Sequence, residues 1–319
     1  MRITGWIGGA AAASLVGASF PVSEALVDYP YAAGQCIRYA AGALILTVLL
    51  KGRLGRPTVK EFALLSGVAG VGMVIFNLAV LGAVDRIGAT NAGVVIGASP
   101  VALALIVPLV ARRRPQPRFV AAALLVMAGA ALVNGADERV QALGLALALT
   151  ALAGEVGFTL LAAPLLPRLG AMRVTAWASW IASAQLLVLS TGDLPAPSTD
   201  DLAAIAYLAV ITTALAFVLW FRAVQTLGAD RAGLLIGLMP VAAVAVDALL
   251  NGRAPSPADI AGTALVAMGV VYGARPAKAR APRGGTRAAS SASRAGTSST
   301  CRAASSSPAA ALPARSSHR

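Results

Sequence analysis

The chain has 319 residues, of which 58% are hydrophobic and only 12% are charged, whereas a soluble protein carries about 25% charged residues. The composition therefore indicates a membrane protein. The formal net charge of +13 does not indicate a nucleic-acid partner, because nine of the 26 Lys and Arg residues lie in 275–319, where no aromatic side chain is present to stack on bases. The single histidine is the penultimate residue, His318, and the apolar part of the chain contains none. His-dependent metal sites and His-dependent catalysis are therefore excluded from that part. We expect neither a metal nor a cofactor.

Windows of about twenty apolar residues, bounded by charges or proline, predict ten membrane-spanning helices. They cover 4–24, 31–50, 61–83, 88–111, 118–134, 141–163, 173–191, 202–223, 230–250 and 258–274. The apolar N-terminal run also fits a secretory signal, but its Val16-Gly17 has a counterpart in Val156-Gly157. That counterpart favours a retained span.

The second half of the chain repeats the first after a shift of 140 residues. Residues 84–103 and 224–243 are identical at ten of twenty aligned positions, and the same shift pairs Gly129 with Gly269 without a gap. Internal duplication of a multi-span unit is typical of transporters.

Basic residues concentrate in the connections on one side of the predicted membrane, twelve Lys and Arg against three on the other side. The positive-inside rule then predicts that both termini are cytoplasmic. We expect the chain to lie in the cell (plasma or inner) membrane. Five spans per copy is an odd number, so the two copies enter the membrane in opposite orientations. The predicted fold class is an all-α polytopic membrane protein with ten transmembrane helices in two inverted five-helix repeats, 1–136 and 137–275.

Residues 276–319 are rich in Ser, Ala, Arg and Pro and show no apolar periodicity, so we expect a disordered, basic cytoplasmic tail. Two interpretations remain open. The tail is either a polybasic segment attracted to anionic lipid or a dispensable extension.

Glycine and proline interrupt the fourth and ninth predicted helices at matching positions. Paired interruptions point to a substrate site, because proline removes a helical hydrogen bond and leaves a carbonyl free to face a cavity. The same glycine spacing also lets helices pack closely, and both interpretations remain open. The positions are Gly93, Gly97, Pro100, Gly233, Gly237 and Pro240.

Several segments resemble the EamA-type members of the drug/metabolite transporter superfamily, over about 1–275. They are GASFPVSEAL (17–26), CIRYAAGALIL (36–46), the pair GVVIGASPVALAL and GLLIGLMPVAAVA, FVAAALLVMAGAALV (119–133) and IAGTALVAMGVVYG (260–273). The chain departs from the family at 111–117 and 251–257, where a Gly-Glu pair is common and no acid is present here. The role that the family's glutamates have at those positions therefore cannot be assigned to any residue of this chain.

Two charged residues within predicted spans are the main functional candidates. Glu155 has no Lys or Arg within twelve residues on either side, and a charge at such depth costs roughly 2.5–3.5 kcal/mol on insertion scales. This environment suits a carboxyl group that binds a coupling proton or cation, or one that stays protonated and hydrogen-bonded. The resemblance implies that Arg38 anchors a substrate carboxylate; the alternative is that its side chain extends to the interface.

Weaker candidates complete the predicted site. Glu24 and Asp247, near the outer ends of their helices, are either further coupling groups or interfacial acids. Polar or stacking contacts with substrate are expected from Asn77, Trp180 and Trp220, although such aromatics also anchor or pack helices.

Together these features predict a secondary transporter, not an enzyme, that moves a small metabolite such as an amino acid or related amphiphile by alternating access. Protons are the candidate coupling ion, and export follows from the resemblance alone. The chain has no phosphate-binding GxxxxGK[ST] motif, so we expect secondary transport, either driven by an ion gradient or running downhill. The alternatives are a non-transporting membrane scaffold or sensor and a membrane-embedded enzyme.

Overall fold

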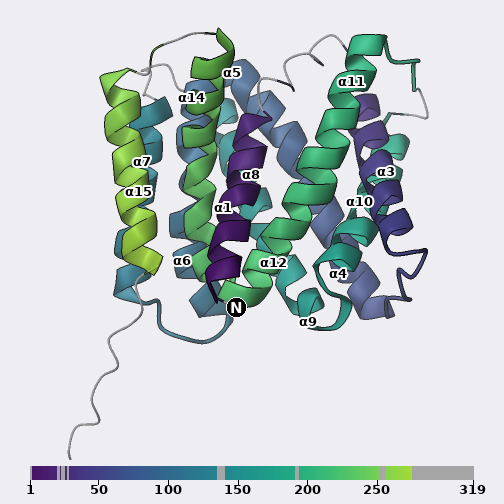
Figure 1. Cartoon of the computed structure of the whole chain (residues 1–319), viewed down its shortest axis with the longest axis horizontal. Helices are drawn as coiled ribbons and strands as arrows, with labels where there is room; N and C mark the ends of the chain where they lie inside the picture. Colours follow the sequence, from purple (N-terminus) through teal and green to yellow (C-terminus); the bar gives the residue numbers. More distant parts are fainter. Residues whose placement is uncertain are drawn as a thin grey trace, which may run out of the picture. The chain divides into compact units, whose positions relative to one another are not determined.

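A computed structural model gives the fold, and every helix that it describes belongs to one compact unit, Met1–Pro276 (Figure 1). Within the described residues all regular secondary structure is helical, and no strand is present among them. The expected disordered tail, 276–319, lies outside this set. The described residues are 2–19, 22, 26, 29–134, 141–190, 194–251, 254 and 256–274.

The helical elements follow one another in several uninterrupted runs, of which α4–η1–α5 and α11–η3–α12 are the longest. In chain order they are α1 (Arg2–Ala18), α3 (Tyr31–Leu49), α4 (Val59–Ala69), the π-helical segment η1 (Gly70–Ile75), α5 (Phe76–Ile96), α6 (Ser99–Val110), α7 (Pro117–Asn134), α8 (Ala142–Ala162), the 3₁₀ segment η2 (Ala163–Leu165), α9 (Leu166–Leu169), α10 (Ala171–Leu189), α11 (Thr199–Tyr207), the π-helical segment η3 (Leu208–Ala216), α12 (Phe217–Leu227), α13 (Ala229–Ala232), the 3₁₀ segment η4 (Gly233–Gly237), α14 (Leu238–Asn251) and α15 (Pro257–Ala274).

Several helices have the length and outer surface that a bilayer requires. Large apolar side chains such as Val48, 67% exposed, and Leu149, 50% exposed, point away from the core; lipid covers such faces at no cost, whereas water does not. The described part of the chain is thus consistent with a polytopic membrane protein. Four runs in it are long and apolar enough to cross a membrane: Tyr31–Leu49, Val59–Ile87, Ala142–Leu169 and Thr199–Leu227.

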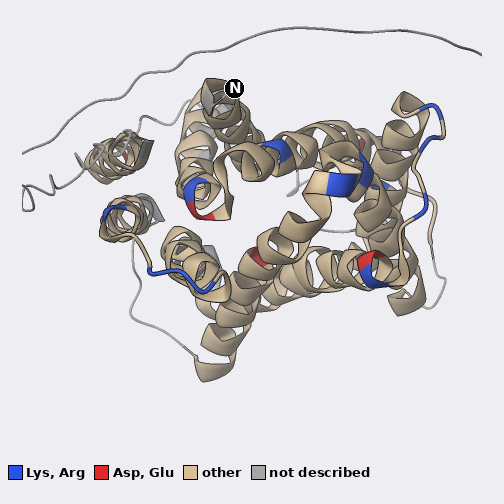
Figure 2. Cartoon of the chain, turned by 90° about the horizontal axis from the view of Figure 1, so that it is seen from below, with Lys and Arg blue, Asp and Glu red and all other residues tan. Residues whose placement is uncertain are grey.

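Most charged residues lie outside the interior of the bundle; Arg38 and Glu155, described below, are exceptions. Figure 2 shows Lys and Arg mainly in loops and at helix ends on the face seen from below. The loop after α3 carries the exposed Lys51, Arg53 and Arg56, and the loop after α6 carries the exposed 112–114 arginine triplet.

One predicted helix boundary is wrong. The sequence placed a break between 61–83 and 88–111, but α5 continues to Ile96 and the interruption comes at 97–98. No proline stops the helix, and Arg86 is accommodated because its Nη1 donates to the carbonyl of Gly82, 2.9 Å away, while the side chain stays on the surface. In the second copy a break does occur, because Gly228 has φ +89° and ends α12.

One helix in each copy, α4 in the first and α11 in the second, begins with a capping box. The hydroxyl of Thr58 accepts from the backbone N–H of Glu61 at 3.3 Å, and the Glu61 carboxylate accepts from the N–H of Thr58. Ser198 and Asp201, 140 residues further on, repeat this capping box at the start of α11. Glu61 also forms an ion pair with Arg168 of α9.

A π-helical segment lies at the same place in each copy. Gly70–Ile75, shifted by 140 residues, falls inside Leu208–Ala216. Such segments are rare and occur frequently at functional sites. Both of them reach the cavity described below.

The largest buried cluster joins α3, α4, α8, α10 and α12. Its fully buried members include Tyr39, Leu46, Leu65, Val174 and Phe221. Small side chains on α10 let α3 approach closely. The core therefore holds in place the helices that carry the candidate charges.

Equivalent helices of the two copies, α7 and α15, pack on each other through equivalent glycines. A Cβ atom on Gly129 would lie 2.5 Å from the carbonyl oxygen of Gly262, and one on Gly269 would lie 2.7 Å from that of Ala122. Ala122 and Gly262 are themselves related by the 140-residue shift. The contact is therefore reciprocal, and the order of the contacts along each helix shows that α7 and α15 run antiparallel.

Candidate functional site

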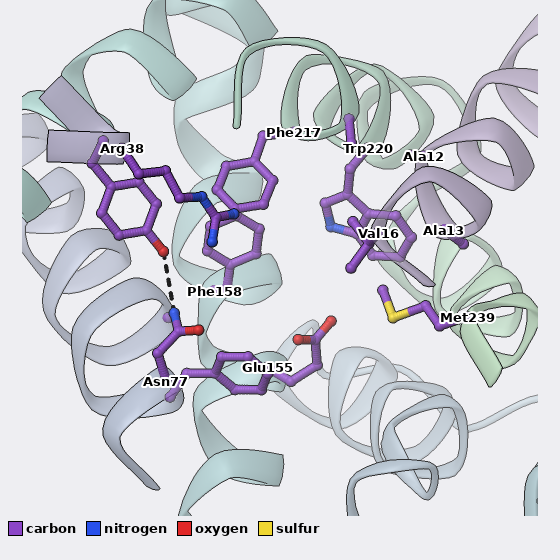
Figure 3. A pocket seen from close by; sticks show the side chains of 14 residues that line it. Ala12, Ala13, Val16, Arg38, Asn77, Glu155, Phe158, Phe217, Trp220 and Met239 are labelled. Atoms are coloured by element: carbon purple, nitrogen blue, oxygen red, sulfur yellow. Dashed lines mark hydrogen bonds between the residues drawn. The ribbon is translucent and has the colours of Figure 1, made fainter. Parts of the chain in front are cut away.

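A cavity lies within the bundle and takes its wall from both halves of the chain (Figure 3). Helices α1, α3, α5, α8, α12 and α14 contribute to it, together with η1 and η3. The lining residues are Ala12, Ala13, Val16, Arg38, Tyr39, Gly72, Phe76, Asn77, Glu155, Phe158, Ala216, Phe217, Trp220 and Met239.

Arg38 enters the cavity from α3 and is only 7% exposed. Its Nε donates to the hydroxyl of Thr213 at 3.0 Å, and its Nη1 donates to Oε1 of Gln35, also at 3.0 Å. These contacts fix the guanidinium plane but are both with neutral groups. Among the described residues no carboxylate lies within ion-pair distance of Arg38, so its charge is available to an anionic ligand.

Glu155 enters the cavity from α8 and is half-buried. Gly154 and Gly157 flank it and let α8 lie against η1, since a Cβ on Gly154 would be 2.9 Å from the carbonyl oxygen of Val71. This close approach fixes the position of Glu155 at the wall. Within the described ranges, its carboxylate has no hydrogen bond and no ion pair with another residue.

The two charged groups face one space. Figure 3 shows the Arg38 guanidinium and the Glu155 carboxylate pointing into the same opening from different helices. No ion pair joins them in the described structure. The arrangement can bind a ligand that carries both an anionic and a cationic group.

Aromatic side chains form one side of the cavity. Phe158 packs on Phe217, with ring centroids 5.2 Å apart, and on Phe221, at 4.9 Å. Trp220 donates its ring N–H to the hydroxyl of Thr159 at 3.3 Å, which orients the indole. This wall favours a ligand with an apolar portion.

Asn77 lies on the side of the cavity that also holds Glu155 (Figure 3). Its side-chain amide donates to the hydroxyl of Tyr39 at 3.1 Å and to the carbonyl oxygen of Met73 at 2.5 Å. The amide oxygen is left for the cavity. The structure thus brings together four of the predicted site residues: Arg38, Asn77, Glu155 and Trp220.

Interruptions are present in the backbone, but the predicted residues whose surroundings the structure describes, Gly97, Pro100, Gly233 and Gly237, are not among those that line the cavity. Residues 97–98 form a turn before α6, and Gly233–Gly237 forms η4 before α14. Pro100 lies at the start of α6, where a proline costs no helical hydrogen bond.

The glycines of η4 sit at packing contacts. A Cβ on Gly233 would lie 2.8 Å from Leu103 of α6, and one on Gly237 would clash with Val126 of α7. These contacts favour the packing interpretation of the glycine spacing.

The remaining candidates lie elsewhere. Trp180 is 36% exposed and donates to the hydroxyl of Thr47 at 3.1 Å, away from the cavity lining. Gly93 lies in α5. Pro240 and Asp247 lie in α14, and the side chains of these two residues are outside the described part of the structure. Glu24 is outside the described residues altogether. In the part of the chain that the structure describes, no cluster of His, Cys, Asp or Glu suits a metal ion.

Several lining residues were not predicted from the sequence, namely Tyr39, Phe158, Phe217 and Met239. Helical spacing was the available signal for two of them. Phe158 lies three residues after Glu155, and Phe217 lies three residues before Trp220, so each shares a helix face with a predicted candidate.

A bundle of apolar helices around an internal cavity with charged and aromatic walls is an architecture typical of membrane transport proteins. A family model described as the EamA-like transporter family matches residues 3–135 and again 142–272. The chain belongs to this family and contains its domain twice.

Relatives carry names of the same kind. The chain is 26% identical over 257 residues to the "Uncharacterized transporter YetK" of Bacillus subtilis (strain 168), covering 76% of this chain and 78% of the relative. It is 24% identical over 261 residues to the "Probable terminal-alkyne amino-acid exporter" of Streptantibioticus cattleyicolor, covering 79% and 87%. A solved structure titled "Crystal structure of protein" shares the fold, with a TM-score of 0.73, 19% identity and coverage of 86% and 97%.

Proposed function

We propose that this chain is a secondary transporter that exports an amino acid or a closely related zwitterion by alternating access. The observation that carries the proposal is that the opposite charges of Arg38 and Glu155 face one cavity without an ion pair to any described residue. An amino acid carries one carboxylate and one ammonium group, which match these two charges. The name of one relative, an amino-acid exporter, supports the same substrate class and direction.

In this proposal Arg38 binds the substrate carboxylate. A guanidinium already oriented by Thr213 and Gln35 loses little entropy when it binds a carboxylate, and charge-assisted hydrogen bonds of this kind are worth about 1.5–3 kcal/mol. The aromatic wall of Phe158, Phe217 and Trp220 then covers the apolar part of the substrate.

Glu155 binds the substrate ammonium group or a proton, one at a time. A half-buried carboxylate with no cationic partner among the described residues gains from either ligand, because each neutralises its charge. A proton arriving from one side therefore displaces the substrate that arrived from the other. This exchange couples export to the proton gradient.

For the architecture, we propose ten spans in two inverted five-helix repeats, 1–136 and 137–275, followed by the basic tail 276–319. The reciprocal, antiparallel packing of α7 on α15, with Gly129 against Gly262 and Gly269 against Ala122, supports an approximate two-fold axis lying in the membrane plane. The equivalent π-helical segments support the same relation. Such an axis allows the cavity to open alternately to either side of the membrane.

For the location, we propose the cell membrane, with both termini in the cytoplasm. The face seen in Figure 2 carries the N-terminus and the basic loops after α3 and α6, which supports its assignment to the cytoplasmic side.

The direct test is growth of cells expressing the chain on a panel of toxic amino-acid analogues. Export predicts resistance to at least one analogue, with loss of that resistance in Arg38→Ala at equal membrane abundance. Equal sensitivity of expressing and non-expressing cells across the panel, together with no binding of amino acids by the purified chain, would contradict the proposal.

A further inference from the structure

Tyr39 contacts both halves of the proposed substrate site. It follows Arg38 on α3, is 1% exposed and lies at the cavity wall. The guanidinium carbon of Arg38 is 5.2 Å from the centroid of the Tyr39 ring, within the range of a cation–π contact. Its hydroxyl, at the far end of the ring, accepts the hydrogen bond from Asn77.

The orientation of the Asn77 amide follows from its two partners. The carbonyl oxygen of Met73 can only accept a hydrogen bond, so the nitrogen of the amide must face it. The second N–H then points to the Tyr39 hydroxyl, and both donors are used. Only the amide oxygen remains for a ligand, and Figure 3 shows it on the cavity side of Asn77.

An amide oxygen that faces the same cavity as Glu155 is suited to accept a hydrogen bond from an ammonium group. Unlike Glu155, it cannot be neutralised by a proton. Asn77 would therefore fix where the ammonium group lies whenever Glu155 is unprotonated and the substrate is bound. The separation between this place and Arg38 is set by the residue that contacts both.

We propose that Tyr39 is a positioning residue that sets the spacing between the carboxylate anchor, Arg38, and the ammonium acceptor, the Asn77 oxygen. It thereby favours substrates in which one molecule carries both charged groups at the spacing that Tyr39 holds. This inference rests on the proposed function. It assigns to the ring of Tyr39 the support of Arg38 and to its hydroxyl the support of Asn77.

The test separates these two roles by measuring binding to the full chain in detergent or vesicles. The probes are L-leucine, L-phenylalanine and L-threonine, each compared with the carboxylic acid that lacks its amino group. For Tyr39→Phe, which keeps the ring, we expect amino-acid affinity to fall about fivefold and affinity for the deaminated acids to stay within twofold. For Tyr39→Leu, which also removes the ring, both affinities should fall.

A double-mutant cycle supplies a readout that a merely structural role would not move. Asn77→Leu should lower amino-acid affinity at least as much as Tyr39→Phe, and adding Tyr39→Phe to it should cause no further loss. Tyr207→Phe, at an exposed position on α11, is the matched control and should change neither affinity.

The outcomes distinguish this inference from the function beneath it. No binding of any amino acid by the wild type, or none lost in Arg38→Ala, contradicts the proposed function. If Arg38→Ala and Asn77→Leu weaken binding but Tyr39→Phe weakens amino acids and deaminated acids equally, or neither, the positioning role is overturned. Full additivity of Tyr39→Phe and Asn77→Leu would overturn it as well.

Discussion

Arg38 on α3 and Glu155 on α8 face the same cavity without forming an ion pair with each other or with another described residue. Opposite charges in a poorly solvated site gain by meeting, unless the fold holds them apart. Here Thr213 and Gln35 hold Arg38, while the packing of Gly154 on η1 holds Glu155. A ligand with both charges can bridge the gap without first breaking a salt bridge.

The first prediction concerns the anchor of the carboxylate. Arg38→Ala should reduce substrate affinity by about 10- to 100-fold, because a charge-assisted contact of about 1.5–3 kcal/mol is lost. Arg38→Lys should recover only part of this loss, since an ammonium group cannot bind Thr213, Gln35 and the substrate in the same fork geometry. Equilibrium binding to purified protein measures both variants. Wild-type affinity in Arg38→Ala would remove Arg38 from the site.

Part of this site could be predicted from the sequence. Arg38, Asn77 and Glu155 are polar or charged residues inside apolar spans, which are costly and therefore conspicuous. Tyr39 and Phe158 were not predicted, because aromatic residues in apolar helices are common and only the three-dimensional packing shows which of them reach a cavity.

The helices were largely predictable too, because twenty-residue apolar runs and proline boundaries depend on local sequence. The break predicted before residue 88 does not occur. Asp85 and Arg86 are compatible with a continuous helix, because their charged side chains reach the surface. The π-helical segments depend on the hydrogen-bond register of a whole packed helix, for which a single sequence carries no signal. The roles of Gly233 and Gly237 could not be decided from the sequence, because the same glycine spacing occurs at helix-packing contacts and at substrate cavities.

The second prediction concerns the reciprocal glycines. Gly129→Ala and Gly269→Ala should destabilise the protein by similar amounts, about 1–3 kcal/mol each, because a Cβ at either position meets the backbone of the facing helix. The control is Gly8→Ala on α1, where the nearest side-chain atom would be 3.8 Å away. Thermal unfolding in detergent gives the comparison. Unequal effects, or a loss no greater than that of the control, would argue against the reciprocal packing.

The third prediction concerns topology. Reporter fusions after Arg56, Arg114 and Arg173 should report the cytoplasm, and fusions after Glu138 and Asp200 should report the opposite side, because the basic loops stay inside. An external signal after Arg114 would refute the ten-span count and the inverted repeat with it.

The fourth prediction concerns coupling. Glu155→Gln removes the charge at nearly constant shape, so expression should survive while transport driven by a pH gradient is lost. Exchange of labelled for unlabelled substrate across vesicles should persist at raised substrate concentration, since it needs no proton and Arg38 still binds the carboxylate. Wild-type pH dependence in this variant would make Glu155 structural and would leave the coupling role to Glu24, to Asp247 or to neither.

The central claim is that Arg38 and Glu155 bind the two charged ends of one substrate, and the most direct measurement matches each residue to one end. Binding to wild type, Arg38→Ala and Glu155→Gln is compared for an amino acid, its methyl ester and its deaminated acid. The account predicts that Arg38→Ala weakens the amino acid and the deaminated acid but not the ester, and that Glu155→Gln weakens the amino acid and the ester but not the deaminated acid. Equal losses for all three ligands in both variants would contradict it.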